Sequence, residues 1–201
     1  MVGVDFLVNV TLDAARWVTG VFAGDVAAAH EAGVAFLRRY AVATVPQPVD
    51  IALTGSAGYP LDTTFYQAAK GMLCPYDIVK PGGTAIVAAE CAEGEGSAEY
   101  RDLLDRIESP EQIMALLREP GFYQIDQWNI QEMCKALARY EVFFVCETIA
   151  PERLRRWGVR PFASVRDALR AALAKHGAHA TLAAIPKGPY VEARLASSRG
   201  V

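Results

Sequence analysis

Two apolar stretches followed by a helical pattern open the chain. Residues 5–12 are rich in Phe, Leu and Val, and residues 16–23 have a similar character, which predicts two neighbouring strands. Asp25 is then suited to cap a helix, because apolar residues recur behind it at helical spacing as far as Leu37. Arg38 and Arg39 are basic residues of the kind that favours a helix C-terminus. The first part of the chain therefore predicts a strand–strand–helix segment.

Beyond the proline-rich linker at residues 46–48, apolar stretches of strand length alternate with helical patterns. Asp62 is expected to cap one helix, and Ser109-Pro110-Glu111-Gln112 is a strong start signal for another. Strands separated by helices cannot pair through tight hairpins, so right-handed βαβ crossovers and a largely parallel sheet are expected. The fold class is α/β. The expected strands cover residues 49–53, 84–89, 142–146 and 181–185, and the helices cover 63–73, parts of 98–117, 126–139 and a segment after Ser164.

Composition limits the classes of protein that fit. A length of 201 residues predicts one domain over 1–201, and 52% hydrophobic with 21% charged residues is typical of a globular protein. The net charge is −3 without a basic run, so nucleic acid is not an expected partner. No apolar run approaches the roughly 20 residues that span a bilayer, and no positive residue precedes the first apolar stretch. We therefore expect a cytoplasmic protein without a membrane partner.

The cysteines and histidines do not predict a metal site. Cys74, Cys91, Cys134 and Cys146 are widely spaced and include no C-x-x-C pair, so we interpret them as reduced core thiols. His30 falls in the alanine-rich helix and is expected to be structural. His176 and His179 flank a glycine after a helix, which does not favour a metal pair. We expect no metal ligands on this chain.

A glycine-rich stretch at residues 53–62 leads from a strand directly into a helix. Small residues here would let a ligand approach the backbone, and ligands of open α/β sheets bind beyond the carboxyl ends of the strands. The alternative is an ordinary tight connection. A second glycine-rich stretch, the acidic residues 90–96, is expected to form a mobile loop at a strand end.

The helix after this stretch has two chemically different faces. Tyr66, Gln67 and Lys70 group on one side at i,i+3 and i,i+4 spacing, and apolar residues occupy the other. An ammonium, an amide and a phenol together can bind a carboxylate and hydrogen-bond an adjacent oxygen. The alternative is a solvated helix face. The apolar side consists of Phe65, Ala69, Met72 and Leu73.

These motifs resemble a known family. Residues 58–62 (Gly-Tyr-Pro-Leu-Asp) followed by residues 66–72 (Tyr-Gln-Ala-Ala-Lys-Gly-Met) resemble the C-terminal domain of the nickel-pincer-dependent 2-hydroxyacid racemases of the lactate racemase type. Shorter stretches extend the resemblance over most of residues 5–145. They lie at residues 22–25, 29–33, 80–83 and 126–128.

The resemblance implies an isomerase in which a nickel-pincer nucleotide takes hydride from the substrate Cα and returns it to either face of the 2-keto acid. By the same resemblance, Lys70 and Gln67 would be catalytic contacts to the substrate's oxygens, and Tyr66 and Trp128 would line its pocket. The family's cofactor lysine, metal-binding histidine and acid/base histidines lie in an N-terminal domain, and their motifs have no counterpart here. The resemblance thus implies a partner domain, in cis or in trans, that holds the cofactor.

Two other readings stay open. One is a non-catalytic α/β module that binds a small carboxylate, and the other is a structural domain whose polar helix face docks a partner. An adjoining sequence with a metal-binding lysine and histidine would favour the enzyme, and its absence would favour the binder. The basic aromatic run at residues 153–157 is expected to be a solvated face.

Overall fold

The computed structural model describes residues 3–196, which fall into two compact units that divide between Ala43 and Thr44. The first unit contains the expected strand–strand–helix segment: β1 (Leu7–Leu12), β2 (Val18–Gly24) and α1 (Val26–Ala41). Asp25 caps α1 as predicted, since its carboxylate accepts from the Ala28 N–H at 3.0 Å. Among the described residues, no helix is both long and apolar enough to cross a membrane.

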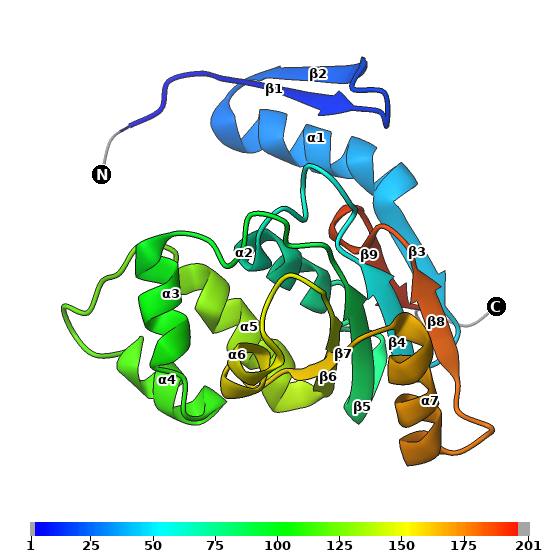
Figure 1. The fold of residues 1–201 in the computed structure, drawn as a ribbon. Coiled ribbons are helices and arrows are strands. Elements are labelled where there is room, and N and C mark those ends of the chain that lie inside the picture. Colours follow the sequence, from blue (N-terminus) through cyan, green and yellow to red (C-terminus); the bar gives the residue numbers. More distant parts are fainter. Residues whose placement is uncertain (1–2, 197–201) are drawn as a thin grey trace. The chain divides into compact units, whose positions relative to one another are not determined.

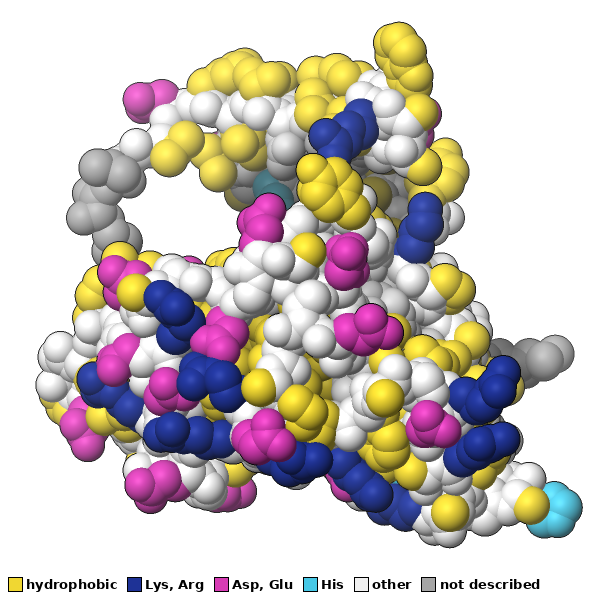
Figure 2. Space-filling model, in the orientation of Figure 1, with side chains coloured by type: hydrophobic (Ala, Val, Ile, Leu, Met, Phe, Trp, Pro, Cys, Tyr) yellow, Lys and Arg dark blue, Asp and Glu magenta, His cyan; other side chains and the backbone are white. Residues whose placement is uncertain are grey.

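The β1–β2 hairpin buries only one of its faces. The Phe22 ring points towards α1 and packs on Phe36, with ring centroids 5.6 Å apart. The alternate side chains leave the other face apolar and exposed, and hydrophobic side chains cover this part of the molecule in Figure 2. Strand periodicity of two explains the division, because successive side chains point to opposite faces. The exposed apolar residues are Val8, Val10, Leu12, Val18 and Val21.

The second unit is built on a five-stranded parallel sheet with the order β7-β6-β5-β4-β8 (Figure 1). This confirms the predicted α/β class with a parallel sheet flanked by helices. Each parallel neighbour is reached through a helical crossover, as the alternating pattern requires. The strands are β4 (Val49–Gly55), β5 (Val79–Ala88), β6 (Glu141–Val145), β7 (Arg160–Phe162) and β8 (Leu182–Ile185), and a short β3 (Val42–Val45) pairs with β9 (Glu192–Leu195).

Helices cover both faces of this sheet. On one face, α7 (Val165–His176) packs over Ile51, Ile86 and Phe143. The larger core lies on the other face, where the neighbouring residues Ala52, Val87 and Phe144 meet the remaining helices (Figure 1). Burial on both faces explains why the strands read as nearly continuous apolar runs. Those helices are α2 (Phe65–Ala68), the 3₁₀ helix η1 (Ala69–Met72), α3 (Ala98–Asp105), α4 (Pro110–Leu116), α5 (Gln127–Arg139) and α6 (Pro151–Arg156), and a further 3₁₀ turn, η2, covers Gly188–Tyr190.

The cap signals were more accurate than the helix lengths. Ser109 accepts from the Gln112 N–H at 3.1 Å, and Ser164 accepts from the Asp167 N–H at 3.1 Å, as expected. The predicted single helix over 63–73 is wrong, because α2 covers four residues and a 3₁₀ turn follows. A full α-helix is not needed to bring Gln67 and Lys70 together, since they are i,i+3 neighbours and such residues are eclipsed in a 3₁₀ helix.

Candidate functional site

The helix that carries the polar face begins two residues later than the sequence suggested. Thr64, and not Asp62, caps α2: its backbone is extended and its hydroxyl accepts from the Gln67 N–H at 3.3 Å. Asp62 is instead buried, with 6% of its surface exposed, and its Oδ2 accepts from the Glu90 N–H at 3.1 Å. Asp62 therefore joins the loop after β4 to the loop after β5. Its Oδ1 is buried without a partner among the residues that the structure describes.

Lys70 lies at the centre of a small polar and aromatic cluster. Its Nζ donates to Gln67 Oε1 at 2.6 Å. The same nitrogen lies 5.3 Å from the centroid of the Tyr66 ring and 5.8 Å from that of Trp128. An ammonium has three N–H donors and Gln67 takes one, so Lys70 keeps the capacity to bind an anion while aromatic faces surround its charge. All four residues suggested by the sequence thus lie together; the Phe65 side of the helix is buried, as expected.

Tyr66 is fixed from the first turn of α5. Its ring packs edge-on against Trp128, with centroids 6.1 Å apart, and its carbonyl accepts from Asn129 Nδ2 at 3.1 Å. Asn129 is itself buried and accepts from the Tyr100 hydroxyl at 2.8 Å. Burial, together with the charge of Asp126 and the hydrogen bond to it, raises the pKa of Tyr66. The surroundings of Tyr66 therefore favour its neutral phenol.

Asp126, Asn129 and Tyr100 were not identified as site-supporting residues from the sequence. Asp126 occupies the cap position of α5 with a left-handed backbone, φ 66°, and its carboxylate turns away from the helix to accept from Ser97 Oγ at 3.1 Å. Asn129 carried a usable signal, because a polar residue next to Ile130 on the apolar side of a helix requires a buried partner. The partner's identity depends on tertiary structure.

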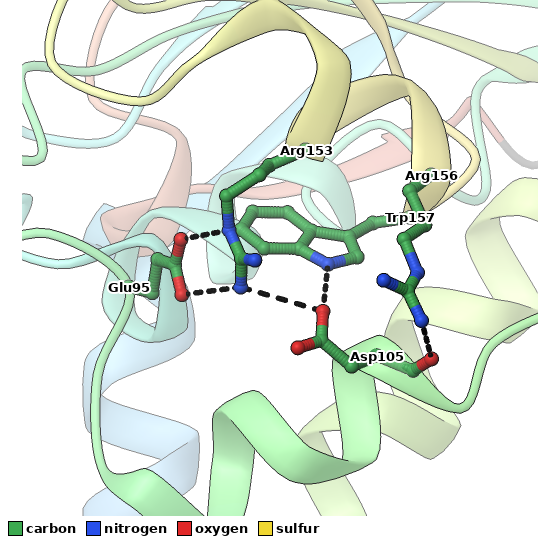
Figure 3. A network of polar contacts seen from close by, with 5 residues as sticks. All are labelled: Glu95, Asp105, Arg153, Arg156 and Trp157. Carbon is green, nitrogen blue, oxygen red and sulfur yellow. Dashed lines mark hydrogen bonds and ion pairs between the residues drawn. The ribbon is translucent and has the colours of Figure 1, made fainter.

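The acidic loop after β5 is held firmly against α2. The Phe65 N–H donates to the Gly94 carbonyl at 2.9 Å and the Tyr66 N–H donates to the Glu95 carbonyl at 3.1 Å. The Glu95 side chain forms a two-point ion pair with Arg153 of α6, whose guanidinium also reaches Asp105 Oδ1 at 3.3 Å (Figure 3). These contacts tie the start of the site helix to two other helices.

The solvated face expected at residues 153–157 is therefore wrong in part. Trp157 is fully buried and its Nε1 donates to Asp105 at 3.4 Å, while Arg156 donates to the Asp105 carbonyl at 2.7 Å (Figure 3). Arg155 and Arg156 follow the expectation, since both are exposed, with the Arg155 side chain 60% exposed beside Glu152. Burial of the indole draws the neighbouring arginines towards acidic partners, because charges near a core need pairing.

The glycine-rich loop after β4 lines a pocket of about 470 Å³ at the carboxyl ends of the strands. Its position is the one expected for ligands of open α/β sheets. Packing also explains part of the composition: a Cβ on Gly55 would lie 2.7 Å from the Pro186 carbonyl oxygen, and Gly58 has φ +74°. Small residues here therefore serve the fold as well as any ligand. The lining consists of Gly55–Gly58, Asp62, Ala88–Glu90, Val145–Thr148 and Pro186.

His176, Cys74 and Cys146 form their hydrogen bonds with residues outside the Lys70 cluster. His176 Nε2 lies 2.8 Å from the hydroxyl of the buried Thr84, and burial lowers the pKa of this histidine. The expectation of four core thiols is only half right: Cys91 and Cys134 are buried, whereas Cys74 and Cys146 are partly exposed. Within residues 3–196, no group of three or more His, Cys, Asp or Glu side chains is placed to hold a metal ion.

Comparison with known proteins agrees with this architecture. The lactate racemase of Lactiplantibacillus plantarum is 32% identical over 186 residues, which cover 91% of this chain and 43% of that protein. The lactate racemase of Thermoanaerobacterium thermosaccharolyticum is 30% identical over 191 residues, with coverages of 94% and 45%. This chain thus spans less than half the length of these curated relatives.

Solved structures give the same result. The lactate racemase apoprotein from Thermoanaerobacterium thermosaccharolyticum matches with a TM-score of 0.86 at 30% identity, over 94% of this chain and 46% of that one. A Thermotoga maritima protein matches with a TM-score of 0.66 at 14% identity, over 95% and 49%, which shows a shared fold alone. A family model described as the lactate racemase C-terminal domain matches residues 44–191 and begins where the second unit begins. The chain therefore belongs to the lactate racemase C-terminal domain family.

Proposed function

We propose that this chain supplies the substrate-binding part of a 2-hydroxyacid racemase or epimerase. The observation that carries the proposal is the convergence of Lys70, Gln67, Tyr66 and Trp128, with the Lys70 Nζ 2.6 Å from Gln67 Oε1 and within 6 Å of both ring centroids. Lactate is the substrate in the names of two relatives.

Lys70 and Gln67 provide complementary contacts for such a substrate. The Lys70 ammonium binds the carboxylate through charge-assisted hydrogen bonds, which are about twice as strong as neutral ones. The Gln67 amide carries both a donor and an acceptor, so it can serve the 2-hydroxyl group and also the carbonyl oxygen that replaces it on oxidation. A charge fixed beside that oxygen stabilises negative charge as it develops there.

Tyr66 and Trp128 form the walls of this half-site. Tyr66 is held from three sides and so presents a rigid aromatic edge, whereas Trp128 keeps 48% of its surface exposed. A half-exposed indole next to a cation suits a cleft that a second domain closes, because removal of water strengthens electrostatic contacts. We propose that the N-terminal part found in the longer relatives supplies that second wall, in cis or in trans.

The nickel-pincer nucleotide implied by the family resemblance does not fit residues of this chain. Among the described residues, no group of three or more His, Cys, Asp or Glu side chains is placed to hold a metal ion, and His176 pairs with Thr84. Imidazole and thiolate are the ligands that nickel prefers among side chains, and they would have to be gathered in one place. We therefore assign the cofactor to the proposed N-terminal partner.

A pair of lysine variants tests the proposal. Lys70→Met removes the ammonium from the aromatic cluster, and Lys135→Met removes a surface lysine that pairs with Glu132 at 2.5 Å. Titration of the chain with lactate, followed through the Trp128 indole N–H resonance, is expected to give saturable shifts for wild type and Lys135→Met and none for Lys70→Met. Equal shifts in all three proteins would remove Lys70 from the site.

Activity tests the catalytic part separately. Mixed with an N-terminal half loaded with cofactor, the chain is expected to interconvert the lactate enantiomers, measured by chiral chromatography. Loss of a charge-assisted contact costs about 1.5 to 3 kcal/mol, so Lys70→Met should lower kcat/KM by about 10- to 100-fold. Binding without any interconversion would favour the alternative of a non-catalytic carboxylate-binding module.

A further inference from the structure

Two cysteines that are far apart in the sequence meet at the carboxyl ends of β5 and β6. The strands are parallel, with Ala88 opposite Val145, so the segments that follow them lie side by side. Cys91 and Cys146 lie in these segments: Cys146 Sγ lies 3.5 Å from the carbonyl oxygen of Glu90, the residue before Cys91, and each thiol is near enough to shift the pKa of the other. The contact joins two loops of the sheet and involves no residue of the Lys70 cluster.

The backbone around the pair is held in place. The Thr148 hydroxyl oxygen lies 2.7 Å from the Glu90 carbonyl, 2.9 Å from the Cys91 carbonyl and 3.2 Å from Cys146 Sγ. Its single hydrogen can serve one of these acceptors at a time. Cys91 has a left-handed backbone, φ 53°, and its N–H donates to the Asp62 carbonyl at 2.9 Å. Thr148 and Asp62 therefore hold the two segments that carry Cys91 and Cys146 next to each other.

The two thiols differ in access. Cys91 is completely buried, whereas Cys146 is partly exposed and lines the pocket of about 470 Å³. A small molecule in the pocket reaches the Cys146 sulfur first. Cys91 lies behind it, where only a group already attached to Cys146 is within reach.

Hydrogen bonds make Cys146 the more acidic member of the pair. The Cys91 thiol donates to its sulfur, and the Thr148 side chain and the backbone of Thr148 and Ile149 add hydrogen bonds, which together lower the pKa of Cys146 to about 5 despite its burial. The thiolate is the nucleophilic form of cysteine, so Cys146 is reactive at neutral pH.

Cys91 is held in the opposite state. Its hydrogen bond to Cys146, its burial and the negative charges of Cys146, Asp62 and Glu90 raise the pKa of Cys91. The pocket is also lined by Asp62, Glu90 and Glu147, whose negative charges disfavour a thiolate on Cys146. The hydrogen bonds to Cys146 have the larger effect, so its pKa is lowered. The opposite pKa shifts favour a thiolate on Cys146 and a protonated thiol on Cys91.

We propose that Cys146 and Cys91 form a redox-active dithiol that is oxidised by low-molecular-weight disulfides of the glutathione class. The Cys146 thiolate attacks one sulfur of the disulfide, and the other sulfur leaves as a thiolate. Cys91 then loses its proton to solvent or to that leaving thiolate and attacks Cys146, which releases the second small thiol. The dithiol is oxidised by two electrons and one small disulfide is reduced to two thiols.

Cys74 provides a matched control within the chain. It is also partly exposed, but its thiol donates to the Val191 carbonyl at 3.3 Å, and burial raises its pKa to about 11. At pH 7 the thiolate fraction favours Cys146 by about 10⁴, while nucleophilicity falls with pKa by about 10²·⁴ to 10³ over this difference. Cys146 is therefore expected to react with a small disulfide about 10- to 40-fold faster than Cys74.

Peptide mapping of the full chain tests the pairing. The reduced protein is treated with oxidised glutathione, free thiols are capped with iodoacetamide, and the unreduced digest is analysed by mass spectrometry. We expect a linked Cys91–Cys146 peptide that dithiothreitol removes, in wild type and in Cys74→Ser alike. A glutathione adduct that persists on Cys146 of the wild type, beside a free Cys91, would overturn the pairing.

The Cys91→Ser variant separates the two steps. Without the second thiol, the mixed disulfide on Cys146 is expected to accumulate instead of resolving. If Cys146 reacts with the small disulfide no faster than Cys74 does, in wild type or in this variant, Cys146 is not the nucleophile. The wild-type map decides the pairing even if the variant does not fold, and racemase activity is not needed for either readout.

Discussion

The ion pair between Glu95 and Arg153 offers a sharp test of how the site helix is held. Glu95→Gln keeps the size of the side chain and removes its charge, leaving Arg153 with Asp105 alone. The Glu95 side chain is only 16% exposed and Arg153 is 37% exposed, so the pair lies between a buried and a surface ion pair. Breaking a buried pair costs about 3 to 5 kcal/mol and an exposed one about 0 to 1.

The surroundings of Arg153 narrow the expected loss in the free energy of unfolding. Arg153 is solvated and retains an acidic partner at 3.3 Å, so the substitution strands no buried charge, and we expect a loss of about 1 to 2 kcal/mol in the free energy of unfolding. For a chain of 150 to 250 residues, each kcal/mol lowers Tm by about 2 to 4 °C. The expected decrease is therefore about 2 to 8 °C, measured by thermal unfolding followed by circular dichroism.

Glu152→Gln is the matched control. It breaks an ion pair of the same chemistry with Arg155, but both side chains are well exposed, at 80% and 60%. Its effect should be within about 0.5 kcal/mol and should vanish at high salt, whereas the effect of Glu95→Gln should persist because salt screens a partly buried pair less. Equal Tm values for the two variants would refute the proposal that this ion pair holds the Glu95 loop against the start of α2.

Two further predictions concern the sheet itself. Gly55→Ala places a Cβ 2.7 Å from the Pro186 carbonyl oxygen and should lower the free energy of unfolding, measured in urea, by about 1 to 3 kcal/mol. Ala57→Gly in the same loop should not lower it, because Ala57 has a left-handed backbone, φ 71°, that glycine adopts without strain, and equal losses would contradict the packing argument. Lys80 and hydrogen bonds from Thr181 hold the pKa of Asp50 well below its usual range. Its stabilisation is therefore present above about pH 4 and lost as pH falls below that value, so Asp50→Asn should flatten the acid limb of the Tm-against-pH curve, and an unchanged limb would refute the pairing.

The fold class followed from the sequence because the signals that define it are local. Alternation of strand-length apolar runs with helical patterns predicted the parallel sheet, and Asp25, Ser109 and Ser164 all cap helices as expected. Three short strands were not predicted, because they have too few residues to show a periodic pattern. The strands β3, β7 and β9 each cover three or four residues, and their pairing partners are distant in the sequence.

Contacts of the candidate site within one helix turn could be predicted from the sequence. Contacts between different elements could not. Gln67 and Lys70 are neighbours on one face, and their contact follows from spacing alone. The Asp62 carboxylate was assigned as a local cap, yet it accepts from Glu90 of another loop. The proximity of Cys91 and Cys146 likewise depends on strand order, which no sequence spacing encodes.

The first turn of α5 has two roles in this domain. Asn129 and Ile130 bury into the core, while Trp128, one residue earlier, reaches the Lys70 ammonium. Substitutions in this turn therefore mix losses of stability with losses of binding, because the same backbone fixes both. Lys70 contacts the turn only through its charge, so a change there separates the two quantities. Aromatic contacts and the Asn129 amide anchor Tyr66 to the core. The Lys70 ammonium, the proposed contact to the substrate, meets this turn only over the Trp128 ring.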